Sequence, residues 1–197
     1  MDSHHVDTKI HQNISYSLPD GRIGELLKLL KSYTEGQKDP EIEIYVKQQI
    51  KLLIEHIQEV EYTLQPTMSH FPVELNPHTG EKHYTHEFSW TRGDLPTLVL
   101  LYQADKAFGN DEYSFIANTV GSIVSKRTQI ELINQNPSFR YGTAGIAECF
   151  YALYHLTSKS FYFEAYQSWI TETYRLSALG YSGFSSDDLL PILLFTL

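Results

Sequence analysis

Apolar residues recur every three or four positions along most of this chain of 197 residues, which is the spacing of amphipathic helices. No segment alternates apolar and polar residues strongly enough to predict a strand. The pattern therefore predicts an all-α protein. The expected helices span residues 21–33, 40–57, 94–108, 111–126, 143–157 and 160–179, and a last helix starts at Ser186.

Local signals mark the beginnings of several of these helices. Asp39, followed by a proline, suits the N-cap of the second helix, and Asn110 recaps the chain before the fourth. Ser160 is expected to cap the sixth helix, with acidic residues such as Glu172 on its polar side. Residues 63–92 lose the helical period and contain three prolines, which indicates a long loop.

Three of the predicted helices begin at similar glycine-containing stretches. Each opens a strongly apolar helix, and each is followed by a more amphipathic helix. A buried helix that alternates with a half-exposed one indicates helical hairpins stacked in two layers. The stretches are Gly21-Arg-Ile-Gly24, Gly93-Asp-Leu-Pro96 and Gly142-Thr-Ala-Gly145, and Gly183 is a candidate start of a fourth, degraded copy.

Composition and charge exclude several classes of protein. Fifteen Lys and Arg against 24 Asp and Glu give a net charge of −9, which disfavours binding to nucleic acid or to an anionic membrane. The single cysteine, Cys149, excludes an internal disulfide and a zinc site with two thiolates from this chain. The start has no signal-peptide pattern, and the longest apolar run is far shorter than the roughly 20 residues of a spanning helix. We therefore expect a soluble, cytoplasmic protein.

The glycine stretches and the residues before them resemble the motifs of a known family. Ser89-Trp-Thr-Arg-Gly-Asp-Leu-Pro96 and Phe139-Arg-Tyr-Gly-Thr-Ala-Gly-Ile-Ala147 are similar to the W-C-x-G-D-x-G and C-H-G-T-A-G motifs of the lanthionine synthetase C (LanC, lantibiotic cyclase) family. Asp20-Gly-Arg-Ile-Gly24 resembles that family's earlier H-G-x-x-G motif. The order of the motifs is the same, and the resemblance covers about residues 15–195, which correspond to the C-terminal half of a family member.

The resemblance implies both a fold and a chemistry. The family fold is an α/α toroid of seven helical hairpins, so this chain is expected to form a partial toroid of about three hairpins plus a final helix. Family members close thioether rings in lanthipeptides by adding a peptide cysteine to a dehydrated serine or threonine. A zinc ion held by two cysteines and a histidine stabilises the reacting thiolate.

At the matching positions this chain lacks those zinc ligands. Thr91 stands at the first cysteine, Arg140 at the second and Tyr141 at the histidine. Neutral hydroxyl groups are poor zinc ligands, and a guanidinium repels the ion. Cys149 lies in an apolar helix, where a core position is expected. We therefore predict no cofactor for this chain.

The resemblance also suggests where a site would lie. Asp20 replaces the histidine credited with acid–base work, Glu87 stands where an arginine is expected, and Arg92 follows the first zinc position; these three are the candidate catalytic positions. The predicted pocket consists of Trp90, Thr91, Arg92, Gly93, Asp94, Arg140, Tyr141, Gly142 and Gly145.

Each of these residues also has a structural interpretation. Asp94 is expected to cap a helix, and the tryptophan of the second motif to pack in the core. Arg92, Arg140 and Tyr141 would cluster around the emptied metal position, where an arginine could bind a carboxylate or phosphate. The alternative is that such an arginine only pairs with Glu87 or Asp94.

Two other constellations have chemical potential. Four of the nine histidines fall in the loop 63–92, namely His70, His78, His83 and His86. The last two would share a face and could hold a metal ion if the segment were helical; the alternative is a solvated polar loop. Asp20 and Asp94 could form the acid pair of a glycosidase, but capping explains each of them equally.

The sequence leads to two hypotheses about function. We expect an N-terminal tail over residues 1–14 and a single domain over 15–197. The first hypothesis is a non-catalytic, peptide-binding or scaffold member of lanthipeptide-type modification. The second is a half-enzyme cyclase whose missing parts come from another chain. A peptide substrate or leader peptide is the expected ligand, and exposed apolar edges of a partial toroid predict a homo-oligomer or a partner chain.

Overall fold

The all-α prediction is confirmed by a computed structural model, which describes residues 13–36, 38–61, 64–65, 67–127, 136–140 and 142–181. These ranges contain six helices and three two-residue strands. The helices are α1 (Arg22–Glu35), α2 (Pro40–Ile54), α3 (Asp94–Phe108), α4 (Asp111–Val124), α5 (Thr143–Thr157) and α6 (Ser160–Ala178). The predicted helix from Ser186 and the candidate fourth glycine stretch lie outside the described residues.

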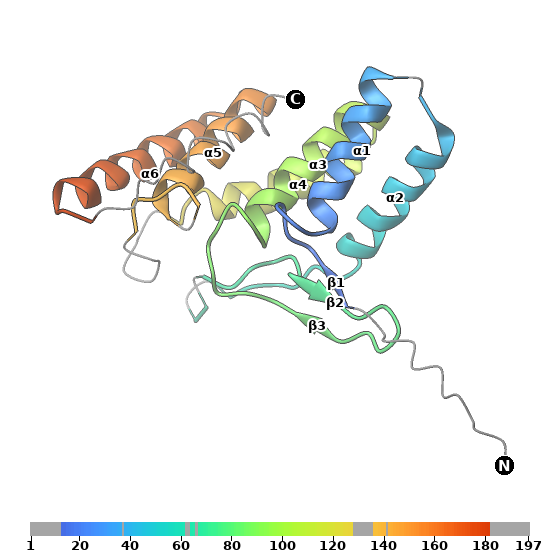
Figure 1. Cartoon of the computed structure of the whole chain (residues 1–197), viewed down its shortest axis with the longest axis horizontal. Coiled ribbons are helices and arrows are strands. Elements are labelled where there is room, and N and C mark those ends of the chain that lie inside the picture. The colour runs from blue at the N-terminus through green and yellow to red at the C-terminus, as the bar shows by residue number, and fades with distance from the viewer. Residues whose placement is uncertain are drawn as a thin grey trace, which may run out of the picture.

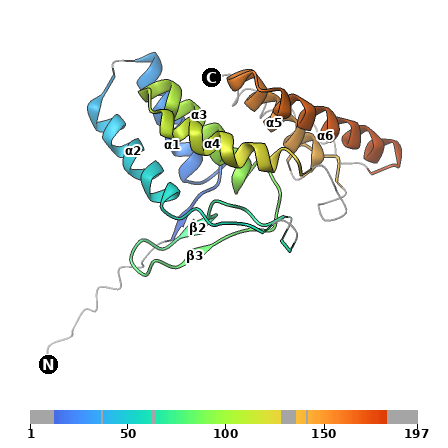
Figure 2. The same ribbon diagram turned by 180° about the vertical axis from the view of Figure 1, so that it is seen from behind.

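The six helices form three successive hairpins. α1 packs with α2, α3 with α4, and α5 with α6. α3 lies between α1 and α5, so these three helices make an inner layer, as the alternation of apolar and amphipathic helices predicted (Figure 1). The view from behind shows the same order, with the α5–α6 hairpin at one end and the α1–α2 hairpin at the other (Figure 2). We number the hairpins as repeats one to three.

Two of the three outer helices, α2 and α4, begin with the predicted polar caps, and the cap predicted for α6 is wrong. The Asp39 side chain accepts a hydrogen bond from the backbone N–H of Glu41 at 2.8 Å, and Asn110 caps α4 in the same way. At α6 the N-cap is Lys159, which makes no side-chain cap, and Ser160 is the first helical residue.

Glu172 is also not where the helical period put it. It is buried, and Arg175 donates two hydrogen bonds to its carboxylate, at 2.6 and 2.5 Å. Tertiary packing of α6 therefore buries a side chain that the helical period of the sequence had placed in solvent. The ion pair within one turn compensates the charge that burial would otherwise leave unsolvated.

The inner helices begin differently, at the motif glycines. Gly21, Gly93 and Gly142 are the N-caps of α1, α3 and α5, and none of them has a side-chain cap. In the first turn of α1, a Cβ atom on Gly24 would lie 2.0 Å from the Leu18 carbonyl oxygen. The chain before the helix therefore folds back against its first turn, which only glycine permits.

Residues 63–92 contain more structure than the predicted loop. β1 (Ile14–Ser15), β2 (Glu74–Leu75) and β3 (Lys82–His83) form an antiparallel sheet in the order β1-β2-β3. The sheet lies beside the start of α1 (Figure 1). The expectation of no strands is thus wrong for six residues, because two-residue strands are too short to give a periodic signal.

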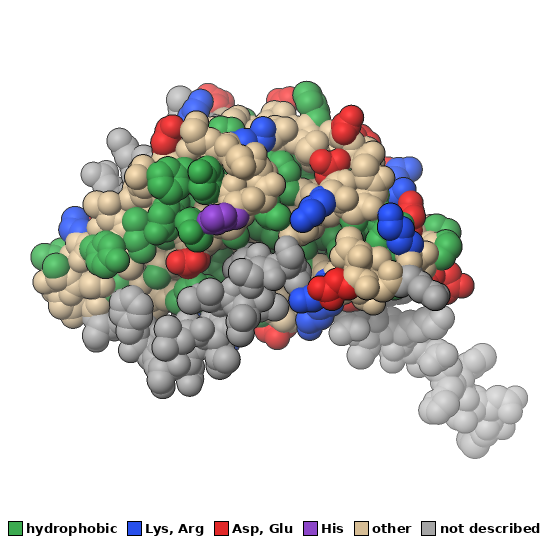
Figure 3. Space-filling model, turned by 90° about the horizontal axis from the view of Figure 1, so that it is seen from above, with side chains coloured by type: hydrophobic (Ala, Val, Ile, Leu, Met, Phe, Trp, Pro, Cys, Tyr) green, Lys and Arg blue, Asp and Glu red, His purple; other side chains and the backbone are tan. Residues whose placement is uncertain are grey.

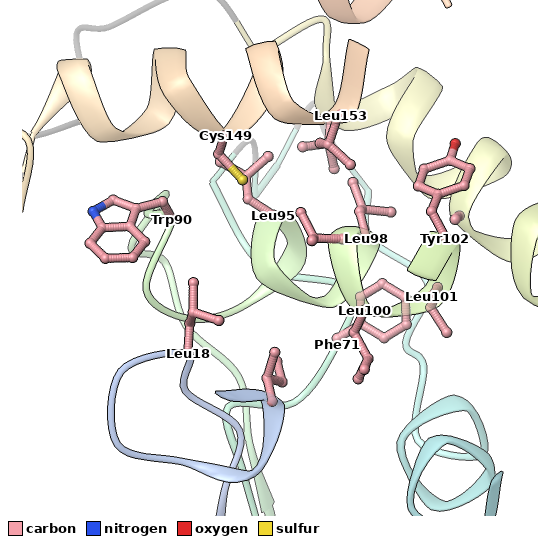
Figure 4. Packing of buried hydrophobic residues seen from close by; sticks show 14 of the residues in the cluster. Leu18, Phe71, Trp90, Leu95, Leu98, Leu100, Leu101, Tyr102, Cys149 and Leu153 are labelled. Carbon is pink, nitrogen blue, oxygen red and sulfur yellow. The ribbon is translucent and has the colours of Figure 1, made fainter. Parts of the chain in front are cut away.

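The core is one cluster of buried side chains that reaches from Tyr16 to Trp169. In Figure 4, Leu95 of α3 and Cys149 of α5 point toward one another, and Leu98 faces Leu153. Cys149 is fully buried, and burial raises the pKa of its thiol, so its prediction as a core residue is confirmed. Among the described helices, none is both long and apolar enough to cross a membrane.

Replacing Gly24 by alanine is expected to lower the free energy of unfolding by about 1–3 kcal/mol, because the new methyl group must displace the Leu18 carbonyl. At an open helical position the same replacement raises stability, by up to about 1 kcal/mol. Urea unfolding followed by circular dichroism measures the sign, with Ser32→Ala on the exposed side of α1 as control. A Gly24→Ala variant more stable than the parent would contradict the close approach.

Candidate functional site

Trp90 joins the second and third motifs. Its indole Nε1 donates hydrogen bonds to the carbonyl oxygens of Phe139, at 2.9 Å, and Arg140, at 3.2 Å. The indole also packs against the Phe139 ring, with 5.2 Å between ring centroids. A Cβ atom on Gly145 would lie 2.3 Å from Trp90 Cδ1, so the glycine makes room for the indole. Trp90 is buried, as predicted, and it fixes one motif loop to the other.

The first motif is joined to the second through the backbone. The Leu18 N–H donates to the Thr91 carbonyl oxygen at 2.7 Å, and Ser17 forms an isolated antiparallel bridge with Arg92. The second motif loop therefore contacts the segment before the first glycine stretch and, through Trp90, the loop before the third. The loop that carries Thr91 lies against the loop that carries Arg140.

Two of the three residues that the resemblance places at the zinc ligands are described by the structure. Thr91 is buried, and its Oγ1 lies 2.8 Å from Ser89 Oγ in a hydrogen bond within the loop. Arg140 is exposed, and its carbonyl oxygen is held by Trp90. Tyr141 lies outside the described residues. A hydroxyl engaged by a serine and a guanidinium are not a donor set that fits zinc.

The candidate catalytic positions lie on the surface. Arg92 Nε is 3.6 Å from Glu87 Oε2, and half of the Arg92 side chain is exposed, so the two charges pair in solvent. This geometry agrees with the structural alternative for Arg92. Asp20 is exposed at the rim of a hollow of about 790 Å³ beside the start of α1.

The histidines of residues 63–92 do not form the hypothetical metal site. His83 lies in β3 rather than in a helix, and its Nε2 is 3.4 Å from Glu81 Oε1. His86 Nδ1 is 3.3 Å from the Thr67 hydroxyl. The part of the chain that the structure describes holds no group of three or more His, Cys, Asp or Glu side chains arranged to bind a metal ion.

Asp94 is the centre of a buried polar cluster that the sequence did not reveal. Its Oδ1 accepts hydrogen bonds from the backbone N–H groups of His70, at 2.7 Å, and Phe71, at 3.2 Å. Its Oδ2 lies 3.1 Å from His70 Nδ1 and 3.3 Å from Arg127 Nη1. The expectation that Asp94 caps α3 is therefore wrong, because its acceptors face a distant segment instead.

Arg127 completes the cluster from the chain just after α4. Its Nη2 donates to the Met68 carbonyl oxygen at 2.8 Å, and its guanidinium lies 5.3 Å from the Phe88 ring centroid. The side chains of Arg127 and His70 are each 7% exposed and that of Asp94 is 1% exposed. His70 is thus a buried structural residue rather than part of a solvated loop. With both oxygens of Asp94 engaged, the acid-pair hypothesis with Asp20 gains no support.

Comparison with known proteins agrees with the motif geometry. The family model described as lanthionine synthetase C-like protein matches residues 3–189. The search of curated proteins gave no match.

Replacing Asp94 by alanine is expected to lower the free energy of unfolding by about 3–5 kcal/mol, because the buried Arg127 guanidinium loses its carboxylate. Asp94→Asn retains one acceptor for the two backbone N–H groups and should cost less. Asp111→Ala in the exposed first turn of α4 is the control, with an expected cost of at most about 1 kcal/mol. Equal losses for Asp94→Ala and Asp111→Ala in urea unfolding would contradict the cluster's role.

Proposed function

The chain belongs to the lanthionine synthetase C-like family, and from this premise we propose that it is a peptide-binding or scaffold member that lacks the family's zinc chemistry. The observation that carries the proposal is the contact between the two motif loops. Trp90 holds the loop of Thr91 against the loop of Arg140, yet neither residue offers a thiolate or an imidazole. The framework of the family site is retained while its ligands are replaced.

The chemistry of this spot supports a role without metal. A zinc ion in the family binds the substrate thiol and stabilises its thiolate. Here the positive charge beside the motif loops comes from arginine. A guanidinium donates hydrogen bonds to carboxylates but, unlike a zinc ion, cannot coordinate a thiolate. The exposed Arg92–Glu87 pair presents both signs of charge, which suits polar contacts with a peptide rather than thiol activation.

The alternative is a cyclase half-enzyme completed by another chain. The contacts of the second motif loop with the segment before the first glycine stretch and with the loop before the third favour it, because a second chain placed there could add ligands. The two hypotheses differ in one measurement. A half-enzyme forms thioether rings in a dehydrated precursor peptide once its partner chain and zinc are added. A scaffold member forms no thioether rings under the same conditions.

Metal analysis of the purified chain tests the proposal directly. The parent protein is expected to hold no stoichiometric zinc. The triple variant Thr91→Cys, Arg140→Cys and Tyr141→His supplies the family's ligand set and is expected to bind about one zinc ion per chain. The matched control is Thr91→Ser, Arg140→Lys and Tyr141→Phe, which alters the same positions without adding ligands.

Each outcome of the metal analysis is informative. One tightly held zinc per chain in the parent would overturn the proposal. A triple variant that retains the parent's circular dichroism spectrum but binds no zinc would contradict the correspondence between these positions and the family ligands.

A further inference from the structure

Inner helices contact the following repeat through the same positions, six and nine residues after the motif glycine. In α1 these forward positions are Leu27 and Leu30, which share a small hollow with Gln103 and Lys106 of α3. In α3 the residue nine positions after the motif glycine is Tyr102. Its hydroxyl lies 3.1 Å from that of Tyr162 in α6. The forward positions thus define the side of each inner helix that the next hairpin covers.

Contacts to the preceding repeat use a second set, three and seven residues after the motif glycine. In α5 these rear positions are Gly145 and Cys149. Gly145 is covered by the Trp90 indole of the second repeat, and Cys149 faces Leu95 of α3 (Figure 4). The corresponding residues of α3, Pro96 and Leu100, are buried as well.

At the α5 end of the array the forward positions are Glu148 and Tyr151. Tyr151 is 38% exposed, and its ring lies 5.0 Å from the ring of Tyr166 and 4.3 Å from that of His155. Tyr174, further along α6, is 70% exposed. Hydrophobic side chains gather at this end of the molecule (Figure 3). We call this surface the α5 face.

At the α1 end the rear positions are Gly24 and Lys28. A Cβ atom on Gly24 would meet only Leu18 atoms, so no aromatic ring covers it as Trp90 covers Gly145. Both residues line the hollow of about 790 Å³, where Gly24 is buried against Leu18 of its own chain and Lys28 is exposed. We call this surface the α1 face.

We propose that the α5 face of one copy of the chain docks on the α1 face of a second copy, with Glu148 beside Lys28 and the tyrosines against the hollow. The contact continues the packing of α1 on α3 and of α3 on α5, and it is head-to-tail because the two faces differ. Among the described residues, neither Glu148 nor Lys28 has an ion-pair partner. The proposal does not depend on the zinc chemistry proposed above.

The charges of Glu148 and Lys28 favour a second copy of the chain as the partner of the α5 face. The forward position that holds Glu148 in α5 holds the apolar Leu27 in α1 and Val99 in α3. A further apolar repeat would bury the carboxylate without compensation, which is costly. The rear position seven residues after the glycine is Leu100 in α3 and Cys149 in α5, and only α1 has a cation there. The half-buried Glu148, whose pKa burial raises, therefore finds its complement on the α1 face.

Sedimentation of the full chain over a range of concentrations tests the contact. The parent is expected to associate. Lys28→Glu and Glu148→Lys should each weaken association by at least about tenfold, because each places like charges together. The two variants change the net charge in opposite directions, so a general charge effect would not weaken both. Lys51→Glu, on the exposed surface of α2, is the control and should leave association unchanged.

Mixing the two single variants identifies the geometry. In a head-to-tail contact, the intact α5 face of Lys28→Glu meets the intact α1 face of Glu148→Lys, so the mixture should recover association. A contact between two α5 faces does not include Lys28, so Lys28→Glu alone would then associate as the parent does, which would overturn the head-to-tail geometry. A parent that stays monomeric would overturn the proposal, and so would association unaffected by either variant. Removal of residues 182–197 adds one outcome: association gained by truncation would mean that this segment, and not a second copy, covers the α5 face.

Discussion

The hydrogen bonds from the Trp90 indole to the chain at Phe139 and Arg140 hold the second and third hairpins together where their inner helices begin. They require a residue without a side chain at Gly145, because the indole occupies the place of a Cβ atom. The buried cluster around Asp94 then fixes the loop that carries Trp90, since it joins the first turn of α3 to residues 68–71 and to Arg127. The close contact of Trp90 with Gly145 and the buried Asp94–Arg127 ion pair together therefore set the positions of the motif loops.

Features with a local cause could be predicted from the sequence. The six helices, the caps at Asp39 and Asn110, the glycine N-caps and the buried Cys149 all follow from residues within one or two turns. The neighbourhood of Thr91 and Arg140 could also be predicted, although from the order of motifs and their resemblance to a family rather than from physical chemistry alone.

Features that depend on residues far away in the sequence could not be predicted. An aspartate at the start of a helix is typical of a cap, and nothing beside Asp94 in the sequence indicates that its hydrogen-bond donors lie 23 and 24 residues earlier in the chain. His70 was for the same reason assigned to solvent, although its backbone and ring both contact Asp94. Glu172 fits the polar face of α6 by its period, yet tertiary packing buries it. Asp94 and His70 are satisfied by partners from a distant part of the chain, whereas the partner of Glu172, Arg175, lies within the same helix and only the packing that buries Glu172 is long-range.

The same distinction separates the framework of the candidate site from its chemistry. Gly24 and Gly145 are constrained by a carbonyl oxygen or a ring within about 2 Å of where a Cβ would lie, so the fold itself requires them. The Thr91 side chain is held by a hydrogen bond with the Ser89 hydroxyl rather than by such a close approach, and Arg140 is exposed. The hydrogen bonds of Trp90 go to backbone carbonyl oxygens, so they do not depend on which side chain stands at position 140. The retained motifs are therefore strong support for the fold and give no support by themselves for thiolate chemistry.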